Sequence, residues 1–356
     1  MKHDFAIEPA LRLLYLPNEM EDREQYGPRM VFENMLANNE LEAYQAYSFL
    51  MEQKRSGSSN AALDRLYESA RQFQPDIILW QHPGSFPLPP GFGYSLKNIA
   101  SHPVLAYDER DVYGGRGKPF TQGMRTLASE ADVIFIVGLG DYADWFRKAG
   151  AKRIVYSPHC IDTLRFGHQW DPPTDRQFDV VMIGNIFRPS GLKPGLPGWK
   201  NRWQLAERLS DLLGDRFALY GRGWDGITSA KGELAFLKQE ETLRESWLSV
   251  GWDYYDDTPF YFSNRLPIAL MSGVAHVTNY QPGYEIMFQN GKDLCYAHTV
   301  DEMIDQVCYL LSLPRSRLLE IGLAGQQYAK INLATENVFR NIIQISAYYN
   351  RRFLDK

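Results

Sequence analysis

The sequence predicts an α/β fold of two Rossmann-like domains that face a cleft. At 356 residues, the chain exceeds the roughly 250–300 residues at which a single hydrophobic core usually stops growing. Short apolar runs alternate with helix-like stretches, which is the pattern of a parallel sheet covered on both faces. The alternation begins again after residues 171–177, a stretch rich in Pro and Asp. Two similar domains therefore meet near residues 163–177.

In the first half, continuous apolar runs bounded by turn residues predict strands. They are residues 11–17, 75–83, 102–108, 131–138 and 152–158. Continuous rather than alternating hydrophobicity is typical of strands buried on both faces of a sheet. Helix-like stretches lie between them, for example at residues 61–72 and 141–150. We assign residues 1–165 to an N-terminal domain.

The second half repeats this pattern. Its strand candidates are residues 178–185, 216–223, 246–252, 275–280 and 293–298. We assign residues 166–333 to a C-terminal domain. The last segment, residues 334–356, contains a long amphipathic stretch, and we expect a helix there that packs back on the N-terminal domain.

Composition argues against several classes of protein. The chain has 38 Lys and Arg against 43 Asp and Glu, with no long basic run, so we expect no nucleic-acid partner. No stretch of about 18 apolar residues predicts a transmembrane segment, and charges interrupt the N-terminus where a signal peptide needs an apolar core. Three scattered cysteines are too few for a disulfide framework or a zinc site. We expect a cytoplasmic protein.

The loop after residues 178–185 is a candidate diphosphate site. It begins with Gly184 and Asn185 and holds Arg188, Lys193 and Arg202 among Gly and Pro residues. Ligands of open parallel sheets bind at the carboxyl ends of strands, and exposed backbone N–H groups beside cations suit a diphosphate. The loop is neither a Walker motif nor GxGxxG. For each cation, a solvated surface position is an equal alternative.

The next strand ends in YGRGW, which contributes Gly221, Arg222 and Trp224. Glycine at a strand end permits close approach of the backbone to a ligand. The Trp224 ring could stack on a base, or it could belong to the core or to a domain interface.

A helix start at residues 263–265 is the most informative feature. Ser263 or Asn264 could cap the helix, Pro267 is tolerated in its first turn, and Gly273 would end it. Free N–H groups of the first turn and the guanidinium of Arg265 would both suit a phosphate. The alternative is an amphipathic helix with an ordinary cap.

The loop after residues 275–280 offers further polar groups. It contains Tyr280, Pro282, Gly283 and Glu285. Glu285 would bind sugar hydroxyls or cap the helix that begins there.

In the N-terminal domain, His82, Asp108 and Asp111 follow predicted strands. Any of them could act as a general base on an acceptor hydroxyl. Two carboxylates without further ligands make a poor metal site, and the pair at Asp256 and Asp257 lacks the DxD pattern. We expect no bound metal.

These residues resemble a known family. Residues 156–166, YSPHCIDTLRF, are similar to the strand-and-hinge phrase of retaining family 4 GT-B glycosyltransferases, and residues 178–331 resemble the CgeB-like (spore-maturation-type) glycosyltransferases. The matching residues are Asn264, Arg265, Gly273, Pro282, Gly283, Glu285, Phe288, Gly291 and the segment 308–328.

The resemblance implies a bacterial GT-B glycosyltransferase of the hexosyltransferase type that uses no cofactor and no metal. A nucleotide sugar, either a uridine or a guanosine diphosphate sugar, would bind the second domain. An acceptor of unknown kind (glycan, protein or small molecule) would bind the first domain. Arg188, Lys193 and Arg265 would neutralise the leaving diphosphate.

One position departs from the family pattern. Ile268 stands where such enzymes have a glutamate that holds the nucleotide ribose. A catalytically silent sugar-nucleotide-binding protein is therefore an alternative. A nucleotide-sugar epimerase is another, because that class shares the two-domain architecture.

Overall fold

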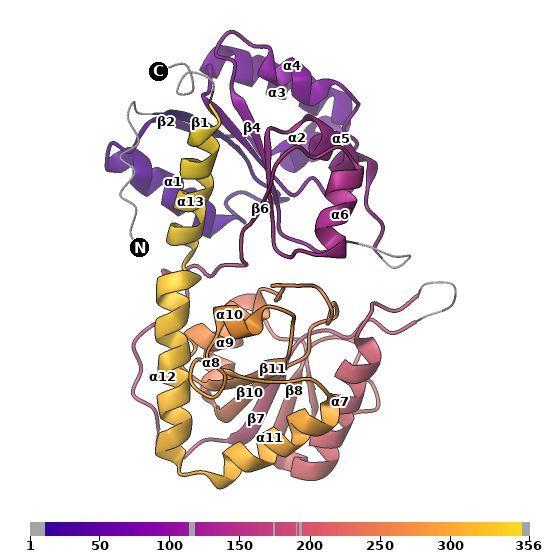
Figure 1. Cartoon of the computed structure of the whole chain (residues 1–356), viewed down its shortest axis with the longest axis vertical. Coiled ribbons are helices and arrows are strands. Elements are labelled where there is room, and N and C mark those ends of the chain that lie inside the picture. Colours follow the sequence, from indigo (N-terminus) through magenta and orange to yellow (C-terminus); the bar gives the residue numbers. More distant parts are fainter. Residues whose placement is uncertain (1–10, 114–117, 174, 190, 192–193, 351–356) are drawn as a thin grey trace. The chain divides into compact units, whose positions relative to one another are not determined.

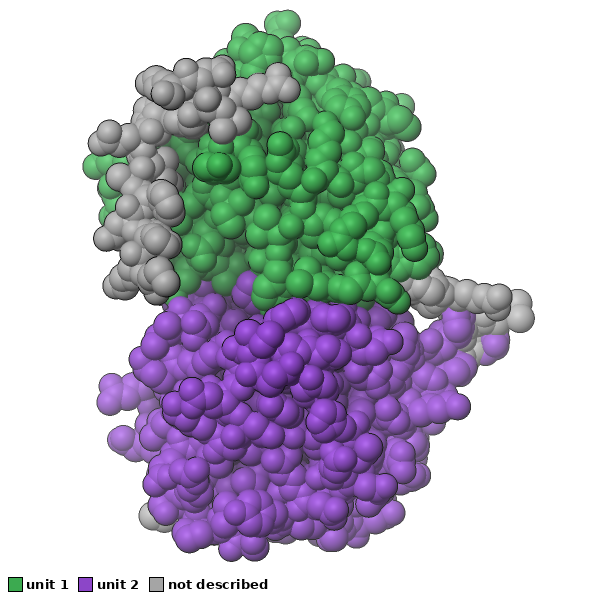
Figure 2. Space-filling view, viewed as in Figure 1, with its two compact units in different colours: residues 1–114, 119–157, 335–356 green, residues 115–118, 158–334 purple. Residues whose placement is uncertain are grey.

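The computed structural model describes residues 11–113, 118–173, 175–189, 191 and 194–350. Lys193 lies outside these residues. The chain divides into two compact units, coloured separately in Figure 2. Unit 1 comprises Met1–Gly114, Pro119–Ser157 and Thr335–Lys356, and unit 2 comprises Gly115–Lys118 and Pro158–Ala334.

Unit 1 contains a sheet of six parallel strands in the order β2-β1-β3-β4-β5-β6 (Figure 1). The strands are β1 (Leu11–Leu16), β2 (Leu41–Ala46), β3 (Ile77–Gln81), β4 (Val104–Glu109), β5 (Val133–Ile136) and β6 (Ile154–Tyr156). The helices are α1 (Tyr26–Ala37), α2 (Phe49–Ser56), α3 (Ser59–Phe73), α4 (Phe92–Lys97), α5 (Gln122–Glu130), α6 (Asp141–Lys148) and α13 (Thr335–Tyr348). The strand order reverses between β1 and β3, which makes that position the switch point of the sheet.

Local sequence explains the helix boundaries of unit 1. Ser58 caps α3, because its side chain accepts a hydrogen bond from the Ala61 amide, and Thr121 caps α5 through the Met124 amide in the same way. Such caps satisfy amides that have no partner inside the helix. The buried residues of α3 recur at helical spacing and face the sheet; they are Ala62, Leu63, Leu66 and Ala70.

Unit 2 contains a second sheet of six parallel strands, in the order β12-β11-β10-β7-β8-β9. The strands are β7 (Phe178–Ile183), β8 (Phe217–Tyr220), β9 (Ala230–Gly232), β10 (Ser246–Gly251), β11 (Ala275–Asn279) and β12 (Cys295–Ala297). The helices are α7 (Trp199–Leu213), α8 (Gln239–Arg244), α9 (Arg265–Met271), α10 (Tyr284–Met287), α11 (Val300–Ser312) and α12 (Arg315–Asn332), with short 3-10 turns η1 (Gly214–Arg216) and η2 (Phe236–Lys238). The order reverses between β7 and β10, so this is the switch point of unit 2.

Helix α13 belongs to unit 1, although it is the last helix of the chain. Its Phe339 ring packs edge to face on Phe32 of α1, with centroids 5.8 Å apart. Arg340 forms an ion pair with Glu40, and Asn350 Nδ2 donates to the Asp76 carbonyl oxygen over 3.0 Å.

The predicted α/β class, with two doubly wound sheets, is confirmed. Each apolar run named above coincides with a strand, although β4 extends one residue beyond its run to Glu109, and β2 and β9 were not predicted. Both lie at the edge of their sheet, where polar residues such as those of LEAYQA are tolerated. Among the helices of the described residues, none is long and apolar enough to cross a membrane.

The expected cap of the helix at residues 263–265 is wrong. Asn264 precedes α9 with φ −57° and ψ −16°, and its side chain makes no capping hydrogen bond. A capping side chain normally requires extended backbone at this position, whereas Asn264 is already helical. The helix has only seven residues.

Candidate functional site

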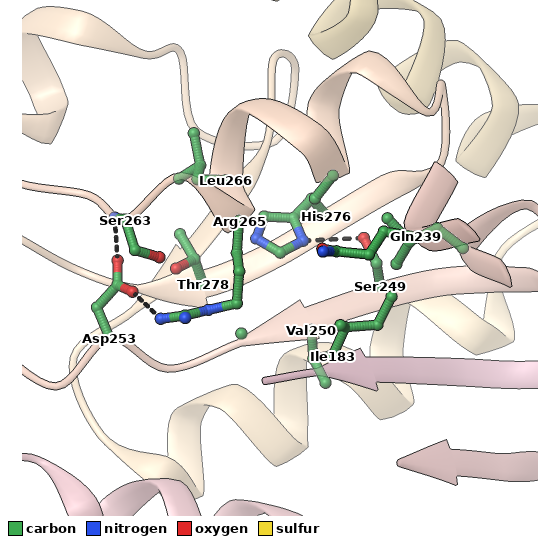
Figure 3. A pocket seen from close by; sticks show the side chains of 13 residues that line it. Ile183, Gln239, Ser249, Val250, Asp253, Ser263, Arg265, Leu266, His276 and Thr278 are labelled. Carbon is green, nitrogen blue, oxygen red and sulfur yellow. Dashed lines mark hydrogen bonds and ion pairs between the residues drawn. The ribbon is translucent and has the colours of Figure 1, made fainter. Parts of the chain in front are cut away.

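The carboxyl edge of the unit 2 sheet brings several predicted residues together at its switch point. Gly184 and Asn185 follow β7, and Asp253 lies two residues beyond the neighbouring strand β10. Arg265 begins α9 and reaches this edge from the side (Figure 3). Ligands of doubly wound sheets bind in this position because loops and free backbone groups meet there.

Two glycines keep this edge free of side chains. A Cβ atom on Gly221 would lie 2.3 Å from the Gly184 carbonyl oxygen, and the φ angle of Gly221 is +136°. A Cβ atom on Gly184 would lie 3.5 Å from Arg265 Nε. The bare backbone of the β7 end therefore lies directly beside the guanidinium of Arg265.

Arg265 is held in place by an acidic partner. Its Nη2 donates to Asp253 Oδ1 over 2.9 Å, and Asp253 Oδ2 accepts from the Ser263 amide over 3.0 Å. Burial alone would raise the pKa of Asp253, but the Arg265 charge and the Ser263 hydrogen bonds outweigh it and hold that pKa below its ordinary value. Asp253 is thus a fixed anion that orients the arginine.

A small pocket lies beneath Arg265, between α9 and strands β10 and β11 (Figure 3). Its volume is about 20 Å³, room for about one water molecule and far too little for a nucleotide. Its wall includes His276, whose Nδ1 lies 2.9 Å from Ser249 Oγ. Burial lowers the pKa of His276 to about 4, so this imidazole is neutral near pH 7.

Arg202 does not face a ligand site. Its side chain is 1% exposed, and its Nε and Nη2 both donate to the Trp252 carbonyl oxygen, while Nη1 donates to that of Asn185 over 2.9 Å. Burial lowers its pKa to about 10. We therefore reassign Arg202 from binding a diphosphate to joining the ends of β7 and β10.

Trp224 is likewise a structural residue. Its indole is buried, stacks on Trp203 and donates from Nε1 to the Gly184 carbonyl oxygen over 2.7 Å. It fits the core alternative and leaves no ring face for a base.

Two further predicted arginines lie near these tryptophans. Arg222 is exposed and donates its backbone amide to Asn185 Oδ1 over 2.8 Å. The Arg188 guanidinium lies over the Trp203 ring, 4.2 Å from its centroid.

The loop after β11 carries an aromatic and acidic cluster. Tyr280 donates its hydroxyl to Glu285 over 2.8 Å, and the Tyr280 ring lies 4.3 Å from that of His298. Gly283 has φ +97°, and a Cβ atom there would come within 2.7 Å of the Phe260 ring. Pro282 accepts a backbone hydrogen bond from Phe260. The loop is therefore fixed by packing, and Glu285 and Asn264 stay exposed.

The carboxyl edge of the unit 1 sheet places His82 beside Glu109. His82 follows β3, Glu109 ends β4, and His82 Nδ1 lies 2.5 Å from Glu109 Oε1. Asp111 Oδ2 lies 3.8 Å from His82 Nε2. The structure thus brings two of the predicted residues together, and adds a carboxylate that the sequence analysis did not select.

Asp108 faces a different environment from His82. It is fully buried, and its Oδ2 accepts from Arg110 Nε over 2.8 Å. Burial raises the pKa of Asp108, although Arg110 acts against this shift. A carboxyl group enclosed in this way has no access to an acceptor hydroxyl, so we do not retain Asp108 as a base.

Part of the chain matches a model of a known protein family. A family model described as glycosyl transferase-like matches residues 202–344. That match covers most of unit 2 and part of α13. No protein of curated function matches the sequence.

Solved structures match nearly the whole chain. Anabaena Alr3699/HepE in complex with UDP and glucose is 12% identical, with a TM-score of 0.58 over 94% of this chain and 99% of that one. Sucrose-phosphate synthase from Thermosynechococcus elongatus is 9% identical, with a TM-score of 0.64 over 97% and 100%. A glycosyltransferase from Rickettsia africae is 10% identical, with a TM-score of 0.61 over 96% and 100%. The chain has the GT-B fold of these proteins.

Proposed function

We propose that this protein is a glycosyltransferase that moves a hexosyl group from a nucleotide sugar to an acceptor hydroxyl. The observation that carries the proposal is the arrangement of Arg265 at the switch point of unit 2. There it lies beside the backbone of Gly184, against which Gly221 packs. The family match over residues 202–344 and the fold likeness to glycosyltransferases support the same function.

Arg265 is built to bind the leaving diphosphate. Asp253 occupies only Nη2, and no other polar group among the described residues bonds Nε or Nη1. The remaining donors of a guanidinium form a fork that fits phosphate oxygens. Charge that develops on the diphosphate as the sugar leaves is stabilised best by such a preorganised donor.

We propose that the donor is a uridine diphosphate sugar. We also propose that the enzyme is of the CgeB-like type. Alr3699/HepE, which shares the fold, is described in complexes with UDP and with UDP-glucose. In unit 1, His82 is the acceptor-side base, because it stands at the carboxyl edge of the sheet and Glu109 holds its Nδ1.

Binding of UDP tests the proposal directly. We expect Arg265→Ala to weaken UDP binding by roughly 10- to 100-fold in calorimetry, since hydrogen bonds to charged groups contribute about 1.5–3 kcal/mol. Arg317→Ala is the matched control, because Arg317 is exposed and pairs with Glu320 on α12. Unchanged affinity in Arg265→Ala would remove this arginine from the site.

A double variant guards against a trivial loss of folding. Arg265→Ala leaves the buried carboxylate of Asp253 without its cation, which is destabilising in itself. Arg265→Ala combined with Asp253→Asn removes both charges. If both variants bind UDP weakly while circular dichroism shows them folded, the loss is due to the missing guanidinium.

A silent sugar-nucleotide-binding protein is the second candidate, favoured by one observation. Ile268 is 1% exposed and packs in a hydrophobic core cluster. The position where a glutamate was expected to hold the ribose is therefore filled by a buried apolar side chain. UDP-glucose that binds but releases no UDP with any of a panel of sugar and lipid acceptors would favour this candidate. Release of UDP with one acceptor would exclude it.

A further inference from the structure

We propose that Glu109 is a positioning residue that holds His82 in the tautomer and orientation needed to accept a proton from the acceptor hydroxyl. This inference rests on the proposed glycosyl transfer and adds to it the residue on which the base depends. Its physical basis is the contact between His82 and the buried Glu109 at the carboxyl edge of the unit 1 sheet.

The couple stands at the ends of β3 and β4, next to the switch point of unit 1. Strand β3 lies between β1 and β4, and Gln81 pairs with Asp108 in the sheet, which places the next residues, His82 and Glu109, side by side. His82 has a φ angle of +34°. This left-handed conformation is unfavourable for a residue with a side chain, and such conformations are often found at functional sites.

Backbone hydrogen bonds hold His82 in that conformation. Its amide donates to the Asp108 carbonyl oxygen over 2.8 Å. Its own carbonyl oxygen accepts from Asn18 Nδ2 over 2.5 Å. Asn18 comes from the loop after β1, so both neighbours of β3 fix the turn at His82.

Glu109 is fully enclosed, and both of its oxygens are occupied. It is 0% exposed. Oε2 accepts from the Tyr107 hydroxyl over 2.6 Å, and Oε1 accepts from the Asp111 amide over 2.9 Å and lies 2.5 Å from His82 Nδ1. A buried carboxylate needs such donors, because its desolvation is otherwise costly.

These contacts determine which imidazole nitrogen carries the proton. A carboxylate is only an acceptor, so Nδ1 must be the donor, and the lone pair of the neutral ring lies on Nε2. Nε2 faces the Tyr113 hydroxyl at 3.3 Å and Asp111 Oδ2 at 3.8 Å. A Cβ atom on Gly84 would lie 3.6 Å from Nε2, so glycine at this position avoids a further side-chain contact with the ring.

The proposed chemical step uses Nε2 of His82 as the proton acceptor. As the acceptor oxygen forms its bond to the anomeric carbon, the bond from that carbon to the diphosphate oxygen breaks and its electron pair leaves with the diphosphate. The hydroxyl proton passes to Nε2 of His82. Glu109 stays ionised and stabilises the imidazolium that results, because an opposite charge in contact favours the protonated ring.

Charged or titratable groups other than Glu109 also act on His82 within the described part of the chain. Asp111 and Tyr113 follow β4 and face Nε2, Asp108 interacts with the ring through its charge, and Tyr107 acts through Glu109. A pH dependence alone would therefore not identify Glu109. The tautomer of His82 would identify Glu109, because among the groups named here Glu109 is the one that contacts Nδ1.

Nuclear magnetic resonance of the ¹⁵N-labelled full chain measures that tautomer. The chain has seven histidines, and the signal of His82 is identified as the one that is lost in His82→Asn. In the wild type we expect Nδ1–H with an unprotonated Nε2 at about pH 8. In Glu109→Gln, which preserves the size of the side chain, we expect mixed tautomers and a pKa of His82 lower by about 1 or more, since a contacting opposite charge shifts pKa by about 1–3.

Asp111→Asn is the matched control for charge. It removes a carboxylate near Nε2 without removing the contact at Nδ1, so we expect a lower pKa of His82 with the tautomer preserved. An Nε2–H tautomer in the wild type would overturn the proposal, and so would identical His82 signals in the wild type and Glu109→Gln.

The catalytic role is tested by the release of UDP from UDP-glucose, with water or an added acceptor as nucleophile. We expect His82→Asn to lower the rate by roughly 10²- to 10⁴-fold. In Glu109→Gln the rate should fall at least about tenfold, and the acid limb of its pH profile should shift with the measured pKa. UDP affinity should stay unchanged in both variants.

The outcomes separate the two proposals. A wild-type protein that binds no UDP would overturn the proposed function and with it the catalytic role of the couple. A wild-type protein that binds UDP and releases it from UDP-glucose, with the same rate and pH profile in Glu109→Gln, would overturn the role of Glu109 alone.

Discussion

Side chains at the carboxyl edge of unit 2 fall into two groups that residue type alone does not separate. Arg265 keeps donors available beside Gly184, whereas Arg202 uses its donors on the backbone carbonyl oxygens of Trp252 and Asn185. The sequence analysis made both arginines candidates for contact with a phosphate. The difference is burial, which depends on how α7 and α9 pack, and that packing is not visible in the local sequence.

The choice of carboxylate in unit 1 shows how sensitive a site prediction is to one residue. The predicted strand ended at Asp108, but β4 continues to Glu109. Successive side chains of a strand point to opposite faces, so Asp108 meets Arg110 while Glu109 meets His82. Apolar periodicity locates a strand well and its last residue poorly.

The close approach of Gly221 to Gly184 gives a prediction about stability. In Gly221→Ala, the new Cβ atom would lie 2.3 Å from the Gly184 carbonyl oxygen, so the backbone at both strand ends must shift. We expect a loss of more than about 2 kcal/mol in the free energy of unfolding, measured in urea. Gly226→Ala is the control, since Gly226 also has positive φ but nothing within 4 Å of its added Cβ. Equal losses in the two variants would contradict the steric explanation.

His276 gives a prediction about pH. Its folded pKa of about 4 lies below the ordinary 6.5 because the ring is buried. Between these values the unfolded chain binds more protons, so stability falls as the pH drops from about 6.5 to 4. At about 1.36 kcal/mol per pH unit, the interval amounts to roughly 3 kcal/mol. Urea unfolding at pH 7 and pH 4.5 should show a smaller acid loss in His276→Asn than in the wild type. Equal acid losses would show that His276 does not drive this effect.

At the scale of elements, strands buried on both faces were the most predictable. Their continuous apolar runs leave few alternatives, whereas β2 and β9 lie at sheet edges and lack such runs. The start of α9 was placed at the right residues, but the expected cap was wrong. Asn264 has helical backbone angles. The general preference of Asn for cap positions does not show which backbone angles a particular Asn adopts.

Helix α13 gives the prediction that belongs to this scale. Phe339 is 1% exposed and packs against Phe32 of α1. Phe339→Ala should lower the stability of unit 1 by about 3–5 kcal/mol, the usual cost of removing a buried Phe side chain. Tyr348→Ala is the control, because Tyr348 is 67% exposed at the end of the same helix. A loss below about 1 kcal/mol in Phe339→Ala, measured by denaturant unfolding, would show that α13 contributes little to unit 1.

At the scale of the whole molecule, the two sheets share one plan. Each has six parallel strands and one reversal of strand order, and each places its candidate residues at the carboxyl edge beside that reversal. The sequence pattern was sufficient for this plan, because it follows from alternation of apolar runs and helices. The orientations of the candidate side chains within each edge, on which the proposed nucleotide and acceptor sites depend, required the structure.

If unit 2 alone binds the nucleotide, then UDP should protect unit 2 selectively. A ligand at 100 times its dissociation constant stabilises the native state by about 2.7 kcal/mol. Backbone amides that exchange only when the protein opens and releases the ligand should therefore exchange up to about 100-fold more slowly. We expect slower hydrogen–deuterium exchange at the ends of β7, β8 and β10 and at the start of α9. In Arg265→Ala, the same UDP concentration should give little protection there, because less nucleotide is bound. Protection confined to β3 and β4 of unit 1 would show that the nucleotide binds unit 1, and this would overturn the proposed division of roles.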